Sequence, residues 1–211
     1  QAASGAGAAN MKELAALLTS LGVVSGPHLD DPGASALALE RAVTLALRDP
    51  SFPTKEFGAP LAGSLIPWID KPVEDGQTRE EWKGYAETNK ILGTKTPIPV
   101  DGLCVRVGAM RCHSQGLTIK LVRDVPLAEL SAIIASGNEW VRVVPNDKTS
   151  TLAELTPTPV SGTLQVPIGR LHKMKMGGEF LTGFTVGDQL LWGAAEPLRR
   201  MLRILREHLG R

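Results

Sequence analysis

The segment Asp101–Gln115 constrains the fold most, because one β-patterned stretch carries both an arginine and a histidine. Its apolar residues alternate with Cys, Arg and Gly over positions 103–108, which predicts a strand with one apolar and one polar face. Arg106 and His113 are seven residues apart, and an odd spacing places them on opposite faces of an unbroken strand. They can serve one site only if the chain bends between them, and Gly108 is the expected place.

These two side chains suit the recognition of a carboxylate and the transfer of a proton. The guanidinium of Arg106 is a fixed cation whose planar donors can grip a carboxylate through two hydrogen bonds. His113 can take and release a proton near neutral pH. Each residue also has an ordinary structural interpretation, Arg106 as a strand arginine facing solvent and His113 as a hydrogen-bonded strand histidine.

Composition argues against several classes of function. The chain has 211 residues, 43% of them hydrophobic, which is enough for a sizeable core, and its formal net charge is only +1. That charge balance predicts no binding to nucleic acid or to an acidic membrane surface. Four Trp, one Tyr and four Phe are too few for a base-stacking platform.

The cysteines and histidines indicate neither a disulfide scaffold nor a metal site. Cys104 and Cys112 are the only two cysteines, which suggests a reducing cytoplasm and two small buried side chains. The remaining histidines, His28, His172 and His208, have no partners at metal-ligand spacing. No charge-free apolar run is long enough to span a membrane, and no secretory leader opens the chain. The chain begins with Gln rather than Met, so we expect it to be part of a longer protein.

Periodicity predicts both helices and strands without a steady βαβ alternation, which favours an α+β fold. Helices are expected over residues 4–22, 34–48, 78–93, 126–136 and 188–209. Strands are expected over residues 64–70, 98–108, 111–122, 140–144, 164–171 and 180–186, and a loop over 23–33. The last helix has an apolar side and a row of arginines, which we interpret as a solvated face.

Two further helix starts carry candidate binding groups. The small residues Ser4–Gly7 open the first helix and would leave backbone N–H groups for an anion or a cofactor amide, or they form a flexible helix start. Glu80 and Lys83 are three apart and share a helix face, as suits a substrate with both charges. The same pair is also typical of an ordinary surface salt bridge.

Several blocks of sequence, in the same order, resemble the bacterial aspartate-β-semialdehyde dehydrogenase family. They are Gln1–Gly7, Gly63–Asp70, Glu80–Lys83, the Arg106–His113 segment and Phe184–Arg200. The resemblance implies a mixed, largely antiparallel sheet with helices on one face and a homodimer interface on the other. It also implies a substrate-binding and dimerisation domain over residues 1–187, with the helix of 188–211 packing on a dinucleotide-binding domain.

The resemblance assigns roles to the candidate residues. It implies that His113 is the acid/base, that Gln1, Glu80 and Arg106 bind the substrate, and that Lys83 binds phosphate. The NADP contacts it implies are Ser4, Gly5, Ala6, Gly7, Ala8 and Gln189. Gln189 equally fits a polar residue at a helix start.

In the family, a cysteine thiolate attacks the aldehyde, hydride leaves for NADP, and phosphate cleaves the thioester to give aspartyl phosphate. Biosynthesis runs the opposite way, toward lysine, diaminopimelate, methionine and threonine. The family's nucleophile and dinucleotide fingerprint precede Gln1 and are not in this sequence, so we expect this chain alone to be inactive. Two alternatives stay open: a non-catalytic dimerisation module, and a related acyl-phosphate reductase that uses a substrate such as N-acetylglutamyl phosphate.

Overall fold

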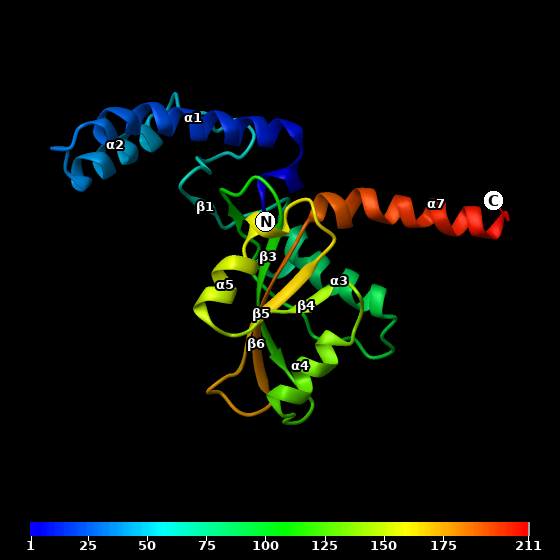
Figure 1. The fold of residues 1–211 in the computed structure, drawn as a ribbon. Coiled ribbons are helices and arrows are strands. Elements are labelled where there is room, and N and C mark those ends of the chain that lie inside the picture. The colour runs from blue at the N-terminus through cyan, green and yellow to red at the C-terminus, as the bar shows by residue number, and fades with distance from the viewer. Residues whose placement is uncertain (211) are drawn as a thin grey trace. The chain divides into compact units, whose positions relative to one another are not determined.

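A computed structural model describes residues 1–210. The chain forms two compact units, Gln1–Met110 and Arg111–Arg211 (Figure 1). Helices and strands occur in both, and the class is α+β as predicted. In the part that the structure describes, no helix is both long enough and apolar enough to cross a membrane.

The first unit is mainly helical. Its elements are η1 (Ala3–Ala6), α1 (Ala8–Asp30), α2 (Ala36–Arg48), β1 (Leu65–Ile66), η2 (Glu74–Gly76), α3 (Arg79–Leu92) and β2 (Arg106–Val107). Helix α2 packs along α1, and η1 packs against the beginning of α1. The buried core of this unit consists of Ala3, Leu14, Leu17, Leu61 and Ala62.

Helix α1 differs from the prediction at both ends. It begins at Ala8 rather than at Ser4, because Ala3–Ala6 form a 3₁₀ turn and Gly7, at φ 108°, separates the two helices. The expected loop over 23–33 was wrong, since α1 continues through Pro27 to Asp30. Packing against α2 explains the extra turns, because tertiary contacts override the weak helix preference of glycine and proline.

Helix α3 begins as the sequence predicted. The hydroxyl of Thr78 accepts a hydrogen bond from the backbone of Glu81 at 3.4 Å, and the Glu81 carboxylate accepts one from Thr78 at 2.7 Å. This reciprocal pair is the expected capping box. The helix ends at Leu92, followed by Gly93 in the left-handed conformation.

The long strand predicted over 98–108 was wrong, and so was its apolar face. Only Arg106–Val107 are in a strand, paired antiparallel with β1. Leu103 is 72% exposed, whereas Cys104 and Arg106 are half-buried. The segment instead bonds to the start of the chain, where the nitrogen of Val107 donates to the carbonyl of Gln1 at 3.0 Å.

The expected interruption of the strand is present. Strand β2 ends at Val107 and β3 begins at His113, so the two candidate residues are not on one unbroken strand. A Cβ atom on Gly108 would lie 3.0 Å from the carbonyl oxygen of Leu61, so only glycine fits without a shift of the backbone.

The second unit contains the main sheet. Its elements are β3 (His113–Lys120), α4 (Leu127–Ala135), β4 (Val141–Val143), α5 (Lys148–Glu154), α6 (Pro157–Val160), β5 (Val166–Lys173), β6 (Phe180–Gly187), η3 (Leu191–Ala195) and α7 (Glu196–His208). The strand order is β3-β6-β5-β4, and only the β4–β5 pair is parallel. The predicted mixed, largely antiparallel sheet is therefore confirmed.

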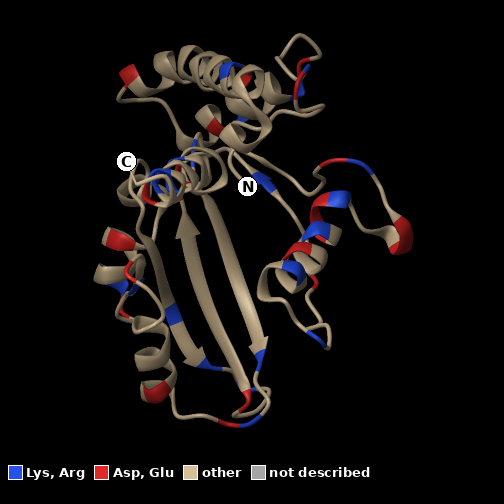
Figure 2. Ribbon diagram, turned by 90° about the vertical axis from the view of Figure 1, so that its right-hand side faces the viewer, with Lys and Arg blue, Asp and Glu red and all other residues tan. Residues whose placement is uncertain are grey.

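Helices α4, α5 and α6 contact the sheet and enclose its core. In Figure 2 the long strands of this sheet carry few charged residues. Two clusters of buried side chains form this core. They are Cys112, Val144, Leu155, Val160 and Val186, and Val125, Leu130, Leu171 and Leu181.

The last helix starts with a π turn over Leu191–Ala195 and continues as α7. Its first turns pack on Trp140, since the Trp140 ring centre lies 3.9 Å from the guanidinium of Arg200 and 5.2 Å from the ring centre of Trp192 in the π turn. Apolar side chains along the helix and at its end are exposed: Leu198, Met201, Leu202, Leu205 and Leu209. The apolar side predicted for this helix is therefore present, and it is exposed.

Candidate functional site

Three of the predicted site residues lie together in the first unit, around the carboxylate of Glu80. The side-chain amide of Gln1 donates to Glu80 Oε1 at 2.7 Å, and Lys83 Nζ donates to Oε2 at 3.1 Å. The Lys83 and Glu80 side chains are 35% and 25% exposed, so the group is reachable from solvent. It presents a cation, an anion and an amide over a few ångströms.

The start of helix α3 is tied to the segment that carries Arg106. Glu81 accepts a hydrogen bond from the nitrogen of Cys104 at 2.8 Å, in addition to its capping bond with Thr78. A single buried carboxylate therefore fixes the first turn of α3, and with it Glu80, against residues 104–106. Figure 2 shows acidic and basic residues close together along this helix.

Glu80 is held in its ionised form. Partial burial raises the pKa of its carboxyl, but the hydrogen bonds from Gln1 and Lys83 outweigh burial, and the pKa lies below its usual value. The carboxylate is therefore ready to receive a ligand cation at neutral pH.

Arg106 is half-buried in strand β2. Its Nη1 donates to the carbonyl of Ala2 at 3.2 Å, the one hydrogen bond of this side chain among residues 1–210. Burial lowers the pKa of the guanidinium, while the charge of Glu80 acts in the opposite direction. The group stays charged at any physiological pH, and its other donors can take a carboxylate through two bonds.

The turn at Ser4–Ala8 differs from the predicted helix start. The nitrogens of Ser4, Gly5 and Gly7 donate to Met110, Ala2 and Ser4, so these three groups are not available to a ligand. No side chain caps α1 at Gly7, however, and nothing lies within 4 Å of the position of a Cβ on that glycine. The open N–H groups are therefore those of the first turn of α1, beginning at Ala8.

The other two predicted residues lie at one end of the sheet in the second unit. His113 is the first residue of β3 and faces Gly187, the last residue of β6, across the antiparallel ladder. Gln189 follows two positions later. Both side chains are half-buried.

Neither cysteine has the environment of a nucleophile. Cys112 is buried, its Sγ lies 3.3 Å from the Ser161 hydroxyl, and burial raises the pKa of its thiol. Cys104 is only half-buried, less than predicted, and burial followed by the charges of Glu81 and Glu80 raises its thiol pKa. A raised thiol pKa leaves less of the reactive thiolate. Across the described residues, no group of three His, Cys, Asp or Glu side chains could hold a metal ion.

Comparison with known proteins identifies the family to which the chain belongs. A family model for the semialdehyde dehydrogenase dimerisation domain matches residues 1–192. The chain belongs to the semialdehyde dehydrogenase dimerisation-domain family. An aspartate semialdehyde dehydrogenase from Francisella tularensis is 46% identical, with a TM-score of 0.91, over 98% of this chain and 56% of that one. This dimerisation domain thus spans a little over half the length of that relative.

More distant solved structures share the fold of the dimerisation domain. Aspartate semialdehyde dehydrogenase II from Vibrio cholerae has a TM-score of 0.73 at 22% identity, over 98% of this chain and 52% of that one. A probable aspartate-semialdehyde dehydrogenase from Pseudomonas aeruginosa has a TM-score of 0.62 at 16% identity, over 90% of this chain and 47% of that one.

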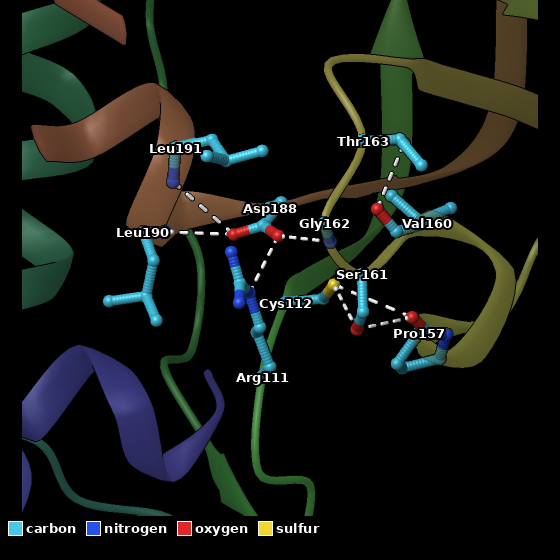
Figure 3. Close-up of polar contacts among 10 residues, drawn as sticks. All are labelled: Arg111, Cys112, Pro157, Val160, Ser161, Gly162, Thr163, Asp188, Leu190 and Leu191. Atoms are coloured by element: carbon cyan, nitrogen blue, oxygen red, sulfur yellow. Dashed lines mark hydrogen bonds and ion pairs between the residues drawn. The ribbon is translucent and has the colours of Figure 1, made fainter. Parts of the chain in front are cut away.

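Sequence reasoning missed two residues of the dimerisation domain, Arg111 and Asp188. The Arg111 Nε donates to Asp188 Oδ2 at 2.7 Å, and the Asp188 side chain is completely buried (Figure 3). A local signal did exist for Asp188, since an aspartate just before an amphipathic helix is typical of an N-cap. Nothing in the sequence indicated its pairing with Arg111.

Proposed function

We propose that this dimerisation domain is part of an oxidoreductase that interconverts L-aspartate 4-semialdehyde and L-4-aspartyl phosphate, with NADP and phosphate. The observation that carries the proposal is the 46% identity to the Francisella enzyme over 98% of this chain. The cluster of Gln1, Glu80 and Lys83 supports it, because the groups suit a small zwitterionic substrate. The product would supply the synthesis of lysine, diaminopimelate, methionine and threonine.

Substrate binding would use the charges of the first unit. Arg106 would hold the α-carboxylate through the guanidinium N–H donors that are not bonded to the carbonyl of Ala2. Glu80, whose pKa is depressed, would accept the α-ammonium, and Gln1 would orient the reacting end. Lys83 would turn from Glu80 to the incoming phosphate, since one lysine can bond either anion.

His113 would move the proton in this scheme. In the oxidative direction it would take a proton from the hydroxyl of the tetrahedral adduct, and in the reductive direction it would return it. Its place at the first position of β3 gives it a rigid backbone, because the strand pairs with β6 over its whole length.

The proposed contacts to a dinucleotide rest on two separate features, the first turn of α1 in the first unit and Gln189 in the second. The first turn of α1 presents uncapped N–H groups beside the open face of Gly7, and Gln189 carries an amide that could pair with the carboxamide of a nicotinamide. We therefore propose Ser4–Ala8 and Gln189 as cofactor contacts of the dimerisation domain. Bound NADP would supply the hydride acceptor.

We propose that the nucleophile is outside these 211 residues. Both thiols here have raised pKa values, and the chain spans only 56% of the Francisella enzyme. The isolated chain would then not turn over substrate. We further propose a substrate-binding and dimerisation domain over 1–187, with residues 188–211 packing on a dinucleotide-binding domain through the exposed apolar side of α7.

The test is phosphate-dependent reduction of NADP with aspartate semialdehyde, using the full-length parent protein. Activity that requires phosphate and falls when Arg106 or His113 is replaced supports the proposal. Equal use of an N-acetylated semialdehyde would contradict the role of Glu80 and indicate a related acyl-phosphate reductase. Absence of turnover in well-folded parent protein would overturn the proposed reaction.

A further inference from the structure

A buried carboxylate joins three separate segments at the end of the sheet that carries His113. Asp188 Oδ2 accepts hydrogen bonds from Arg111 Nε and from the nitrogen of Gly162, both at 2.7 Å. Its Oδ1 accepts from the nitrogens of Leu190 and Leu191 at 3.0 and 3.3 Å. Figure 3 shows the side chain between the β3 approach, the loop after α6 and the start of the last helix.

The carboxylate is ionised despite its burial. Burial raises the pKa of Asp188, but the bonds from Gly162, Arg111 and Leu191 outweigh it, and the pKa lies below its usual value. A buried charge with this many donors has a single favourable position, because any displacement leaves donors unpaired in a low dielectric. Asp188 is therefore a fixed point.

The backbone between Arg111 and His113 is strained. Cys112 has φ 76°, a left-handed conformation that a residue with a Cβ rarely adopts. Such a conformation persists only where the surroundings hold it, and it is common next to functional groups. Two contacts hold it here, the Arg111–Asp188 pair on one side and the Cys112 thiol with Ser161 on the other.

The Arg111–Asp188 ion pair lies next to both candidate residues of this unit in the chain. The β3–β6 ladder ends at the pair His113–Gly187. Beyond that pair, the Arg111–Asp188 ion pair links the segment before β3 to the segment after β6. Asp188 directly precedes Gln189, and Arg111 is two residues before His113. One ion pair thus sets the backbone from which both side chains project.

We propose that Asp188 and Arg111 are positioning residues, which act through the left-handed turn at Cys112 to set the directions of His113 and Gln189. The proposal rests on the proposed function for the roles of those two residues. Arg111 and Asp188 themselves need not touch the substrate.

Stability alone cannot test this, because Asp188 also caps the last helix and its loss would weaken the fold in any case. Glu196 provides a matched control. It is a buried carboxylate in the same helical region, and it accepts hydrogen bonds from Arg199 at 2.7 and 2.6 Å and from Arg200 at 2.9 Å. It bonds to neither the β3 approach nor the Gly162 loop among the described residues.

The first experiment compares Asp188→Asn, Arg111→Met, Arg111→Lys and Glu196→Gln in the full-length parent, at a temperature where all are folded. For Asp188→Asn and Arg111→Met we expect kcat to fall roughly tenfold to hundredfold, with the KM for the semialdehyde within about twofold. Arg111→Lys should recover part of the loss, because it restores a cation. Glu196→Gln should lower Tm but leave kcat within about twofold. Equal kcat for Asp188→Asn and Glu196→Gln would overturn the proposal.

A second readout does not depend on turnover. In the parent protein, the ¹H–¹³C spectrum of the histidine rings, with His113 assigned from His113→Asn, reports the position and titration of that ring. Asp188→Asn should shift the His113 signal and its pH midpoint, and Glu196→Gln should leave both in place. If wild-type parent lacks dehydrogenase activity but the His113 signal shifts, the proposed function fails and the positioning role stands. An unmoved His113 signal in Asp188→Asn would refute the positioning role, whatever the activity.

Discussion

The side-chain amide of Gln1 donates to the carboxylate of Glu80 across 2.7 Å, although the two residues are 79 positions apart. The bond joins the start of the chain to the first turn of α3. Because Lys83 bonds the other oxygen, the carboxylate is oriented from two sides before any ligand arrives. An oriented anion binds a cation with little loss of side-chain entropy, which is the physical basis for the first prediction.

Replacing Glu80 by Gln in the full-length parent should raise the KM for aspartate semialdehyde. A charge-assisted hydrogen bond is worth about 1.5–3 kcal/mol, which corresponds to roughly tenfold to hundredfold in binding. The measurement is steady-state kinetics with aspartate semialdehyde and with succinate semialdehyde, which has no ammonium group. The KM for the second compound should change little, and a similar increase for both would argue against an ammonium contact.

Replacing Arg106 by Lys should lower kcat/KM by roughly tenfold to hundredfold, because lysine keeps the charge but cannot form two parallel bonds to a carboxylate. Arg203→Lys is the matched control, since Arg203 is exposed on α7 and pairs only with Glu207 in the described structure. Kinetics of both variants, with thermal unfolding to confirm the fold, would decide. A fully active Arg106→Lys variant would exclude the two-bond contact.

Thr78→Ala should lower the free energy of unfolding by about 1 kcal/mol, because the variant loses the capping acceptor at the start of α3. Thr78 is 1% exposed and receives the Glu81 N–H, so no water can easily replace its oxygen. Urea unfolding of this chain gives the value. Thr19→Ala, at an exposed position inside α1, should not lower the free energy of unfolding, since alanine favours the helix interior.

Stability should fall in acid through the carboxylate at the start of α7. Hydrogen bonds from Arg199, which outweigh burial, lower the pKa of Glu196 from 4.5 to about 2. A depressed folded-state pKa contributes stability above the unfolded value, and that contribution is lost as pH falls from about 4.5 toward 2. Urea unfolding from pH 7 to pH 2 should therefore show that wild type has a higher free energy of unfolding than Glu196→Gln, and that this difference narrows as the pH falls from about 4.5 toward 2. A difference in the free energy of unfolding that is constant with pH would exclude a contribution from the titration of Glu196.

The purified chain should self-associate, as expected of a dimerisation domain. Analytical ultracentrifugation over a wide concentration range measures this directly. A dimer would support the homodimer proposal, and it would also be expected of a non-catalytic assembly module, from which only the activity assay distinguishes it. A monomer at the highest concentrations would count against both.

Local chemistry explains which elements were predictable. The capping box is formed by Thr78 and Glu81, which are three residues apart, so the start of α3 follows from the sequence alone. The strand predicted over 180–186 is also present, as β6, and it ends one residue later, at Gly187. Helix α1, in contrast, runs past Gly22 and Gly26, because its packing on α2 outweighs the local preference.

The candidate site shows the same division. The charges of Glu80, Lys83 and Arg106 were recognisable from residue type, spacing and family resemblance. The bond between Gln1 and Glu80 was not predictable from spacing, and neither was the pairing of Arg111 with Asp188, 77 positions away. The alternating pattern over 103–107 predicted the wrong buried face, since Leu103 is exposed and Arg106 is half-buried.

The sequence by itself determined the class of fold, the capping box of α3 and the kinds of chemical group at the site, because these follow from residue type, periodicity and close neighbours. The tertiary structure alone decided which of those groups meet. Hydrogen bonds and burial act through space, so only the folded chain could bring Gln1 to Glu80 and enclose the charge of Asp188 among the donors of three segments.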